Sequence, residues 1–257
     1  GDDTAADAID CALASLDRAT ADLVRDKTRP TTIKTRFIAD TQQILRTDSE
    51  ITATISDDTS NSILEKVNKA ILQHDVLIIS DYGKGVLNHS RAQYLILAAK
   101  NAGIPVVVDP KGSNYEIYNG ADVVTPNRKE IRIASGMPVE SVADAGIAAL
   151  KISERHNLDA VLVTLSQDGM LLAKANETHH LDAEAREVFD VSGAGDTVVA
   201  TIASALAAGA ELEDGASLAN VCAGIVVGHP FDTIKVRLQN SGSGNQPNGF
   251  HLLKNIV

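Results

Sequence analysis

The sequence contains few of the residues that build metal centres or disulfide frameworks. It has two cysteines in 257 residues, Cys11 and Cys222, which lie far apart and show no metal-ligand spacing. We therefore expect buried, unpaired thiols in a reducing compartment and no disulfide. The seven histidines form no H-x-x-x-H pair or other ligand cluster, so the sequence gives no indication of a zinc site.

Basic residues and long apolar runs are also scarce. The chain has 23 Lys and Arg against 34 Asp and Glu, a formal net charge of -11. The acidic excess is spread along the chain, which argues against a general nucleic-acid or anionic-membrane partner. The longest apolar runs, 197–210 and 216–228, are shorter than the ~20 residues of a membrane span, and no signal peptide is recognisable. We expect a cytoplasmic protein that holds phosphate groups only through local contacts.

The chain alternates between short apolar runs and segments with helical periodicity. Its length suits one sizeable α/β domain. The alternation predicts a mainly parallel sheet with helices on both faces, and ligands at the carboxyl ends of its strands. We expect strands at 75–80, 105–109, 123–125, 160–164 and 169–173, and helices at 2–25, 60–73, 90–101, 129–135, 141–156 and 198–208.

Residues 31–46 differ from this rhythm. In short patches, apolar and polar residues alternate, which predicts two extended segments around a turn near Asp40. The basic side chains Lys34, Arg36 and Arg46 either protect a sheet edge or, for Arg36, contact a substrate phosphate. The sequence leaves these two interpretations open.

Polar residues follow each expected parallel strand, which predicts a composite site. Carboxylate and lysine pairs come first, in glycine-bounded loops, and the lysines suit phosphate neutralisation. The alternative is a solvated turn held by an aspartate side chain. The strand-end candidates are Asp81 and Lys84, Asp109 and Lys111, Asn127 and Glu130, and Thr164 and Ser166.

The segment Thr-Pro-Asn-Arg-Lys-Glu places Asn127 and Glu130 about one helical turn apart at a helix start. Mg²⁺ prefers oxygen ligands and keeps several waters, so this pair could position hydrated Mg-ATP through water. The alternative is an N-cap with an acidic residue in the first turn.

The run Asp-Val-Ser-Gly-Ala-Gly-Asp ending at Asp196 has the layout of a phosphoryl-transfer site. Its glycines allow a tight turn with accessible N–H groups, and the apolar helix expected next adds the positive end of its dipole. Asp196 could then accept a proton from an attacking hydroxyl. The alternative is an ordinary loop and helix cap.

Taken in order, these motifs resemble the ribokinase-type carbohydrate kinases over residues 1–227. The runs Leu-Ile-Ile-Ser-Asp-Tyr-Gly-Lys-Gly-Val-Leu, Pro-Val-Val-Val-Asp-Pro-Lys-Gly, Val-Val-Thr-Pro-Asn-x-x-Glu and Val-Phe-Asp-Val-Ser-Gly-Ala-Gly-Asp-Thr-Val carry the likeness. They are most similar to the members that act on D-glycero-β-D-manno-heptose 7-phosphate. The resemblance implies a three-layer αβα fold with a β lid at 31–48. It also implies ATP-dependent phosphorylation of the sugar's anomeric hydroxyl, a step toward ADP-heptose and lipopolysaccharide.

The same resemblance implies roles for individual residues. Asp196 would be the catalytic base, and the amides of Gly193, Ala194 and Gly195 would form the anion hole. Asn127 and Glu130 would organise Mg-ATP through water, with a monovalent cation nearby in the intact family, and homodimers would form through the lid. The nucleotide site would be completed by Thr164, Ser166, Gly169 and Asn220.

Both ends of the sequence depart from this pattern. Gly1 resembles an internal point of these kinases, so we expect an open sheet edge and a sugar site without its first strands. Residues 228–257 are similar to a mitochondrial carrier signature, which suggests a join near 226–228 and a linker at 241–249. Three alternatives therefore stay open: another sugar kinase of the family, an impaired fusion fragment that only binds nucleotide, and a carrier-type membrane protein.

Overall fold

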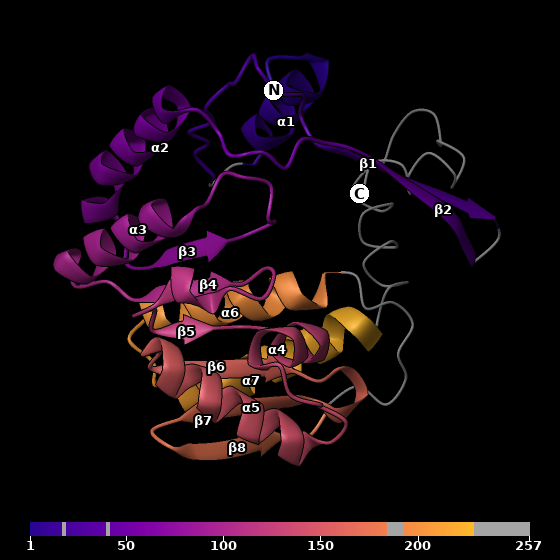
Figure 1. Ribbon diagram of the computed structural model, residues 1–257, viewed down its shortest axis with the longest axis vertical. Coiled ribbons are helices and arrows are strands. Elements are labelled where there is room, and N and C mark those ends of the chain that lie inside the picture. Colours follow the sequence, from indigo (N-terminus) through magenta and orange to yellow (C-terminus); the bar gives the residue numbers. More distant parts are fainter. Residues whose placement is uncertain (17–18, 40–41, 184–192, 229–257) are drawn as a thin grey trace. The chain divides into compact units, whose positions relative to one another are not determined.

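The computed structural model describes residues 1–16, 19–39, 42–183 and 193–228 (Figure 1). The chain divides into two compact units, one containing Gly1–Ala53 and the other Thr54–Pro230. The residues with strand-end motifs all belong to the second, larger unit.

The smaller unit contains a helix and a hairpin. Strands β1 (Ile33–Ala39) and β2 (Gln42–Ser49) pair antiparallel, with Phe37 opposite Leu45 and an irregularity after Phe37. This confirms the two extended segments expected on either side of Asp40, which itself lies outside the described residues. Arg36 lies on β1 directly opposite Arg46.

The long first helix that we expected over residues 2–25 is wrong. The helix α1 covers only Thr4–Ala14, and the guanidinium of Arg25 pairs with the carboxylates of Asp7, at 2.8 Å, and Asp10. In a continuous helix Arg25 would lie ~22 Å along the axis from Asp10. The chain therefore turns back after α1, and the apolar period at Leu16 and Leu23 belongs to exposed residues.

The larger unit is built on a six-stranded sheet in the order β3-β4-β5-β6-β7-β8. Strands β3 to β6 are parallel, and β7 and β8 extend the sheet antiparallel. The bounds are β3 Leu77–Ser80, β4 Val106–Asp109, β5 Val123–Val124, β6 Ala160–Thr164, β7 Met170–Lys174 and β8 Glu177–Leu181. The expected mainly parallel sheet is confirmed. Strand β8 was not expected, because its polar, largely exposed sequence has no apolar period.

Helices cover both faces of this sheet (Figure 1). Helices α3, α4 and α5 pack against one face, whereas α6 and α7 pack against the other. The bounds are α2 Asp57–Ala70, η1 Ile71–Gln73, α3 His89–Ala102, η2 Tyr115–Tyr118, α4 Arg128–Ser135, α5 Val142–His156, η3 Ser166–Asp168, α6 Ala194–Ala207 and α7 Leu212–Gly228. This is the expected three-layer αβα arrangement.

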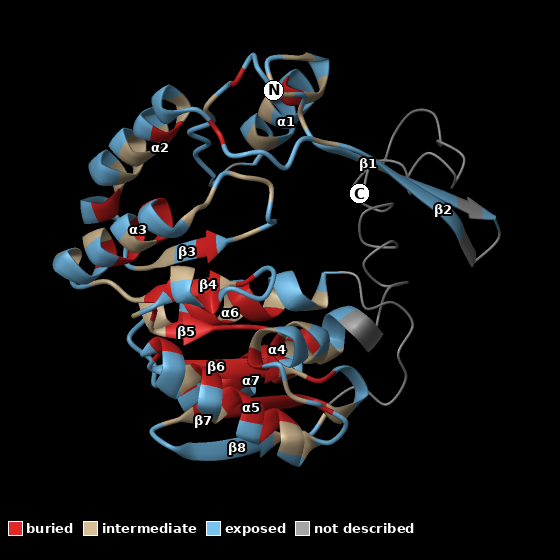
Figure 2. Cartoon of the chain, in the orientation of Figure 1, coloured by how far each residue is buried: buried red, intermediate tan, exposed pale blue. Residues whose placement is uncertain are grey.

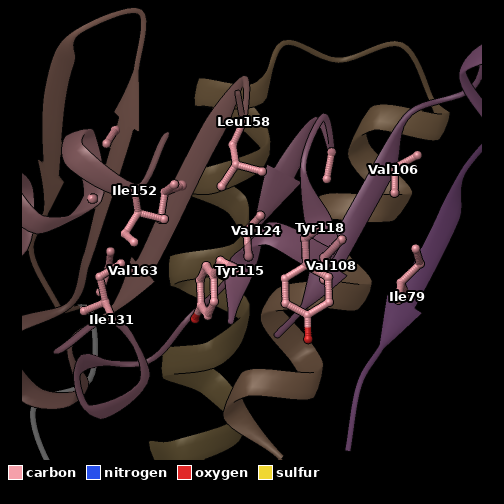
Figure 3. Packing of buried hydrophobic residues seen from close by; sticks show 14 of the residues in the cluster. Ile79, Val106, Val108, Tyr115, Tyr118, Val124, Ile131, Ile152, Leu158 and Val163 are labelled. Atoms are coloured by element: carbon pink, nitrogen blue, oxygen red, sulfur yellow. The ribbon is translucent and has the colours of Figure 1, made fainter. Parts of the chain in front are cut away.

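Successive side chains along each strand point to opposite faces of the sheet, which produces two hydrophobic cores. Val106 and Val108 of β4 face the α3–α5 layer, whereas Val107 faces the α6–α7 layer. Because each face is covered, the central strands are apolar along most of their length, as parallel strands usually are, and become polar only at their carboxyl ends, at Ser80, Asp109 and Thr164. Figure 2 shows this buried centre against the exposed β8, and Figure 3 shows part of the packing around Val108 and Val124.

Two expectations from composition can be compared with the structure. In the part of the chain that the structure describes, every helix is too short or too polar to cross a bilayer. Cys11 and Cys222 are both free thiols, but Cys11 is exposed and Cys222 half-buried, so the expected burial is wrong. Cys11 is exposed because it lies on α1, of which only Ala6 is buried.

The two-sided core predicts a strong dependence of stability on the central strands. We expect Leu162→Ala, at a fully buried β6 position, to lower the free energy of unfolding by ~3 kcal/mol through lost contacts and a cavity. The matched change Leu97→Ala, at a position 60% exposed on α3, should cost under ~1 kcal/mol. Urea unfolding of the two variants measures the difference, and equal losses would contradict this account of the core.

Candidate active site

The residues that follow β3, β4, β5 and β6 lie along one edge of the sheet. Hydrogen bonding continues past the strand ends, because the N–H of Asp81 donates to the carbonyl of Asp109 at 3.0 Å. Asn127 and Thr164 form an isolated parallel bridge, and the N–H of Thr164 donates to the carbonyl of Pro126 at 2.9 Å. The fold therefore brings together the strand-end residues that the sequence singled out.

The loop after β3 is organised by the Asp81 carboxylate. Its Oδ1 accepts the N–H of Gly83 at 2.7 Å, and its Oδ2 accepts the hydroxyl of Tyr118 at 2.7 Å. Gly83 has φ +64°, a conformation that favours glycine. Lys84 lies half-buried in the same loop. The turn held by an aspartate side chain is thus present, and the second carboxylate oxygen links the loop to η2.

Asn127 and Glu130 form a complete capping box at the start of α4. The Asn127 side chain accepts the N–H of Glu130 at 2.9 Å, and Glu130 Oε2 accepts the N–H of Asn127 at 3.1 Å. Glu130 Oε1 pairs with Lys111 Nζ at 2.9 Å. The cap explains why the motif begins a helix, and the ion pair joins that helix start to the loop after β4.

These oxygens fit a hydrated Mg²⁺ better than a directly bound one. Each carboxylate oxygen of Glu130 already accepts one hydrogen bond and keeps a second lone pair for a metal-bound water. Across the described residues, His, Cys, Asp and Glu side chains form no group of three or more that could hold a metal directly. The donor set therefore agrees with contact through water.

Asp109 lies in a strongly negative environment. Its burial, together with the carboxylates of Glu130 and Asp196, raises the pKa of this carboxyl to about 6. Lys111 opposes the shift, and Asp81 adds a smaller contribution in the same direction as the other acids. The start of α6 and the end of β4 thus share one electrostatic site, to which a divalent cation or a metal-phosphate complex is attracted.

The glycine turn begins α6 earlier than the sequence predicted. Gly193 is the N-cap, with φ +82°, and the helix runs from Ala194, so the expected start at Val198 is wrong. Asp196 is exposed in the first turn, beside the N–H groups that a helix start leaves without intrahelical partners. Among the described residues no side chain caps this end. The preceding residues of the motif, 190–192, lie outside the described part.

The connection from β6 to β7 holds three of the nucleotide candidates. Thr164 ends β6, Ser166 has φ +56°, and Gly169 has φ +77°. A Cβ on Gly169 would lie 2.0 Å from the carbonyl oxygen of Leu181. Gly169 is therefore required by the close approach of the chain that follows β8.

Two further candidates lie away from these loops. The buried Asn220 on α7 donates its side-chain amide to the carbonyl of Asp182 at 2.7 Å, which ties α7 to the segment after β8. Its expected place beside adenine stays a prediction. Arg36 belongs to the smaller unit, and its contact with a substrate phosphate also stays a prediction.

The sequence did not reveal two polar contacts of this edge. Tyr118 links the loops after β3 and β4, and Arg128 pairs with Asp168 of η3. Arg128 lies inside the Asn-x-x-Glu motif, where its spacing gives no sign of a partner 40 residues later. Tyr118 gives no functional signal in the sequence, because nothing there predicts where its hydroxyl lies.

Comparison with known proteins identifies the family. The model of the pfkB family carbohydrate kinases matches residues 1–236. The chain belongs to the pfkB family. This agrees with the resemblance to ribokinase-type kinases and makes the edge described above the place where a carbohydrate kinase site is expected.

Curated relatives extend this assignment. The chain is 53% identical over 207 residues to "Bifunctional protein HldE" of Paramagnetospirillum magneticum, covering 80% of this chain and 42% of that protein. It is 42% identical over 256 residues to the protein of the same name in Aeromonas hydrophila, covering 98% of this chain and 53% of that protein. The chain thus spans about half the length of the curated relatives that it matches.

Solved structures confirm the fold. Ribokinase from Giardia lamblia superposes with a TM-score of 0.72 at 17% identity, covering 94% of this chain and 81% of that one. Arabidopsis thaliana ribokinase, solved with ribose and ATP, gives a TM-score of 0.60 at 23% identity, covering 77% of this chain and 64% of that one. The pfkB-family chain therefore has the ribokinase-like fold that was expected.

The expected carrier-like tail has no support. The family match continues to residue 236, past the join expected at 226–228, and the Aeromonas hydrophila relative aligns with 98% of the chain. Residues 229–257 lie outside the described part. The carrier signature is a short pattern that recurs by chance, and the longer alignments carry more information.

Gly169 predicts a measurable loss of stability. We expect Gly169→Ala to lower the free energy of unfolding by ~3 kcal/mol or more, because the added methyl group would overlap the Leu181 carbonyl. Gly136→Ala is the matched control, since Gly136 also has positive φ but nothing within 4 Å of its Cβ position. It should cost ~1 kcal/mol. Chemical unfolding separates the two effects, and similar costs would show that the crowding at Gly169 is unimportant.

The raised pKa of Asp109 predicts a pH-dependent contribution to stability. Above its unfolded pKa the folded carboxyl holds its proton until about pH 6, so unfolding becomes easier as pH rises from 4 to 7. We expect the free energy of unfolding of Asp109→Asn to rise relative to that of the parent by ~1–2 kcal/mol as the pH goes from 4 to 7, after allowance for solvent screening. Unfolding in EDTA at several pH values tests this. The exposed Asp75→Asn controls for loss of a charge, and a pH-independent difference between Asp109→Asn and the parent would contradict this prediction.

Proposed function

We propose that the protein transfers the γ-phosphoryl group of ATP to the anomeric hydroxyl of D-glycero-β-D-manno-heptose 7-phosphate. The product would be the 1,7-bisphosphate used in ADP-heptose and lipopolysaccharide synthesis. The observation that carries the proposal is the position of Asp196, in the first turn of α6 and in the electrostatic environment of Asp109. Identity of 42–53% to HldE proteins and the heptose-kinase motifs support the sugar.

In this mechanism Asp196 is the general base. Its carboxylate takes the proton of the sugar's O1 as that oxygen forms a bond to the γ-phosphorus, and the bond to the bridging oxygen of ADP breaks. The helix-start N–H groups of Gly193, Ala194 and Gly195 would stabilise the charge on the transferring group. The exposed position of Asp196 lets it pass the proton to solvent after transfer.

The other strand-end residues would position the two substrates. Mg²⁺, when bound, neutralises phosphate charge, and Asn127 and Glu130 would hold its waters. Lys84 and Lys111 would neutralise phosphate oxygens near the loops after β3 and β4. The connection after β6, with Thr164, Ser166 and Gly169, and Asn220 of α7 would form the nucleotide side. A monovalent cation near this side is part of the proposal by family resemblance.

The remaining partner assignments are also proposals. The hairpin of β1 and β2 exposes Phe37, Ile44 and Leu45, which favours a homodimer formed through this lid. The acidic net charge favours an enzyme with neither a nucleic-acid nor an anionic-membrane partner, and the two unpaired cysteines favour a reducing, cytoplasmic location. Light scattering at several protein concentrations tests the dimer, and a monomer at every concentration would exclude it.

Calorimetry with Mg-ATP and a coupled ADP-release assay test the proposed activity. We expect Mg-ATP binding and ADP release that depends on heptose 7-phosphate. Turnover with another sugar phosphate but not with this one would indicate a different sugar kinase of the family. Binding without turnover on any sugar would indicate the impaired fragment, and no binding would refute the kinase proposal for this chain.

The role of Asp196 gives a sharper prediction. We expect Asp196→Asn to lower kcat by ~10²–10⁴, because the amide cannot accept the proton, with the Kd for Mg-ATP changed less than about twofold. Asp214→Asn is the matched control, an exposed acid in the first turn of α7, and should leave kcat unchanged. Steady-state kinetics and calorimetry give both quantities. Full turnover by Asp196→Asn would show that Asp196 is not the base.

A further inference from the structure

Tyr118 joins the two loops that carry the phosphate candidates. Its ring is fully buried at the end of η2. Its hydroxyl donates to Asp81 Oδ2 at 2.7 Å and accepts the main-chain N–H of Lys111 at 3.1 Å. One oxygen atom therefore links the loop after β3 to the loop after β4.

The hydroxyl proton has two possible acceptors. The carbonyl of Lys111 lies at 3.4 Å, whereas the Asp81 carboxylate lies at 2.7 Å and is charged. A short hydrogen bond to a carboxylate is stronger than a long one to a neutral carbonyl. The proton therefore lies on the Asp81 side, and burial together with this bond raises the pKa of the Tyr118 hydroxyl, so that it remains a donor.

The linkage continues from Lys111 to the helix start of α4. Lys111 Nζ pairs with Glu130 Oε1 at 2.9 Å, and the Glu130 side chain is only 13% exposed. The Lys111 main chain is held by Tyr118 while its side chain is held by Glu130. The position of Lys111 is thus fixed at both ends, and the orientation of the Asp81 carboxylate is fixed by Gly83 and Tyr118.

The order of the strands separates the substrates along the edge. The nucleotide candidates Thr164, Ser166 and Gly169 lie at or after the end of β6, whereas Asp81 and Lys111 follow β3 and β4. Asp196 acts electrostatically on Asp109, which ends β4. The β3 and β4 loops therefore lie on the acceptor side of the proposed base, away from the β6 connection.

We propose that Tyr118 is a positioning residue for the sugar phosphate, acting through the carboxylate of Asp81 and the main chain of Lys111. The inference rests on the proposed kinase function and adds a residue that determines how the acceptor is held. Tyr118 does not touch the substrate; it fixes the two groups that do.

The neighbouring Tyr115 provides a matched control. Its ring is also fully buried and meets the Tyr118 ring edge-to-face at 5.6 Å between centroids (Figure 3). Its hydroxyl has no hydrogen-bond partner among the described residues. Tyr115→Phe and Tyr118→Phe therefore remove the same atom from adjacent buried rings, and only the second removes a link between the loops.

The test measures KM for each substrate and the Kd for heptose 7-phosphate by calorimetry. For Tyr118→Phe we expect KM and Kd for heptose 7-phosphate to rise about tenfold, and KM for Mg-ATP to change less than about twofold. Tyr115→Phe should match the parent in all three. If Tyr118 were only structural, Tyr118→Phe would reduce the amount of folded enzyme. That would lower the maximal rate but would not raise the KM for heptose 7-phosphate while leaving the KM for Mg-ATP unchanged.

A double-mutant cycle with Asp81→Ala tests the route. If Tyr118 acts through Asp81, Tyr118→Phe should raise the Kd for the sugar phosphate less than about threefold further in the Asp81→Ala background. A full tenfold effect there would overturn the route through Asp81. A Tyr118→Phe variant equal to Tyr115→Phe would overturn the whole inference, and an active parent would still be a kinase. A parent that neither binds nor phosphorylates the sugar phosphate would overturn the proposed function, and this inference with it.

Discussion

The parallel alignment of β3, β4, β5 and β6 is the constraint on which the site depends. Each strand is only a few residues long, yet their shared direction brings every carboxyl end to one edge of the sheet. Main-chain hydrogen bonds beyond the strands, from Asp81 to Asp109 and from Thr164 to Pro126, keep the following loops in register. The candidate site is therefore assembled from residues far apart in sequence.

Charge gives this edge its chemical character. The carboxylates of Glu130, of Asp196 on α6 and of Asp81 act on Asp109, and Lys111 offsets part of their field. Such a site disfavours a bare anion but suits a phosphate that arrives with a divalent cation, while the start of α6 supplies the local donors that an anion needs. Membership of the pfkB family is consistent with this combination, because phosphoryl transfer depends mainly on positioning and charge neutralisation.

Sequence patterns predicted regular elements well where periodicity and packing agreed. The strands of the sheet other than β8, the two extended segments of the hairpin and, as one of two alternatives, the N-cap at Asn127 were expected. The first helix was predicted too long, because the apolar period through Leu16 and Leu23 has no core to cover and Arg25 turns back toward Asp10. The start of α6 was placed too late, because a glycine cap carries no apolar signal. Strand β8 is formed by pairing with β7, which its own composition does not predict.

The sequence by itself determined the alternation of strands and helices, the order of the strand-end motifs and the family. These follow from local periodicity and from residues that act within one turn of each other, such as Asn127 and Glu130. Only the tertiary structure decided which loops meet: the contact of Tyr118 with Asp81, the ion pair of Lys111 with Glu130 and the raised pKa of Asp109. Each depends on distances between segments that are remote along the chain, and those distances are set by packing of the whole sheet.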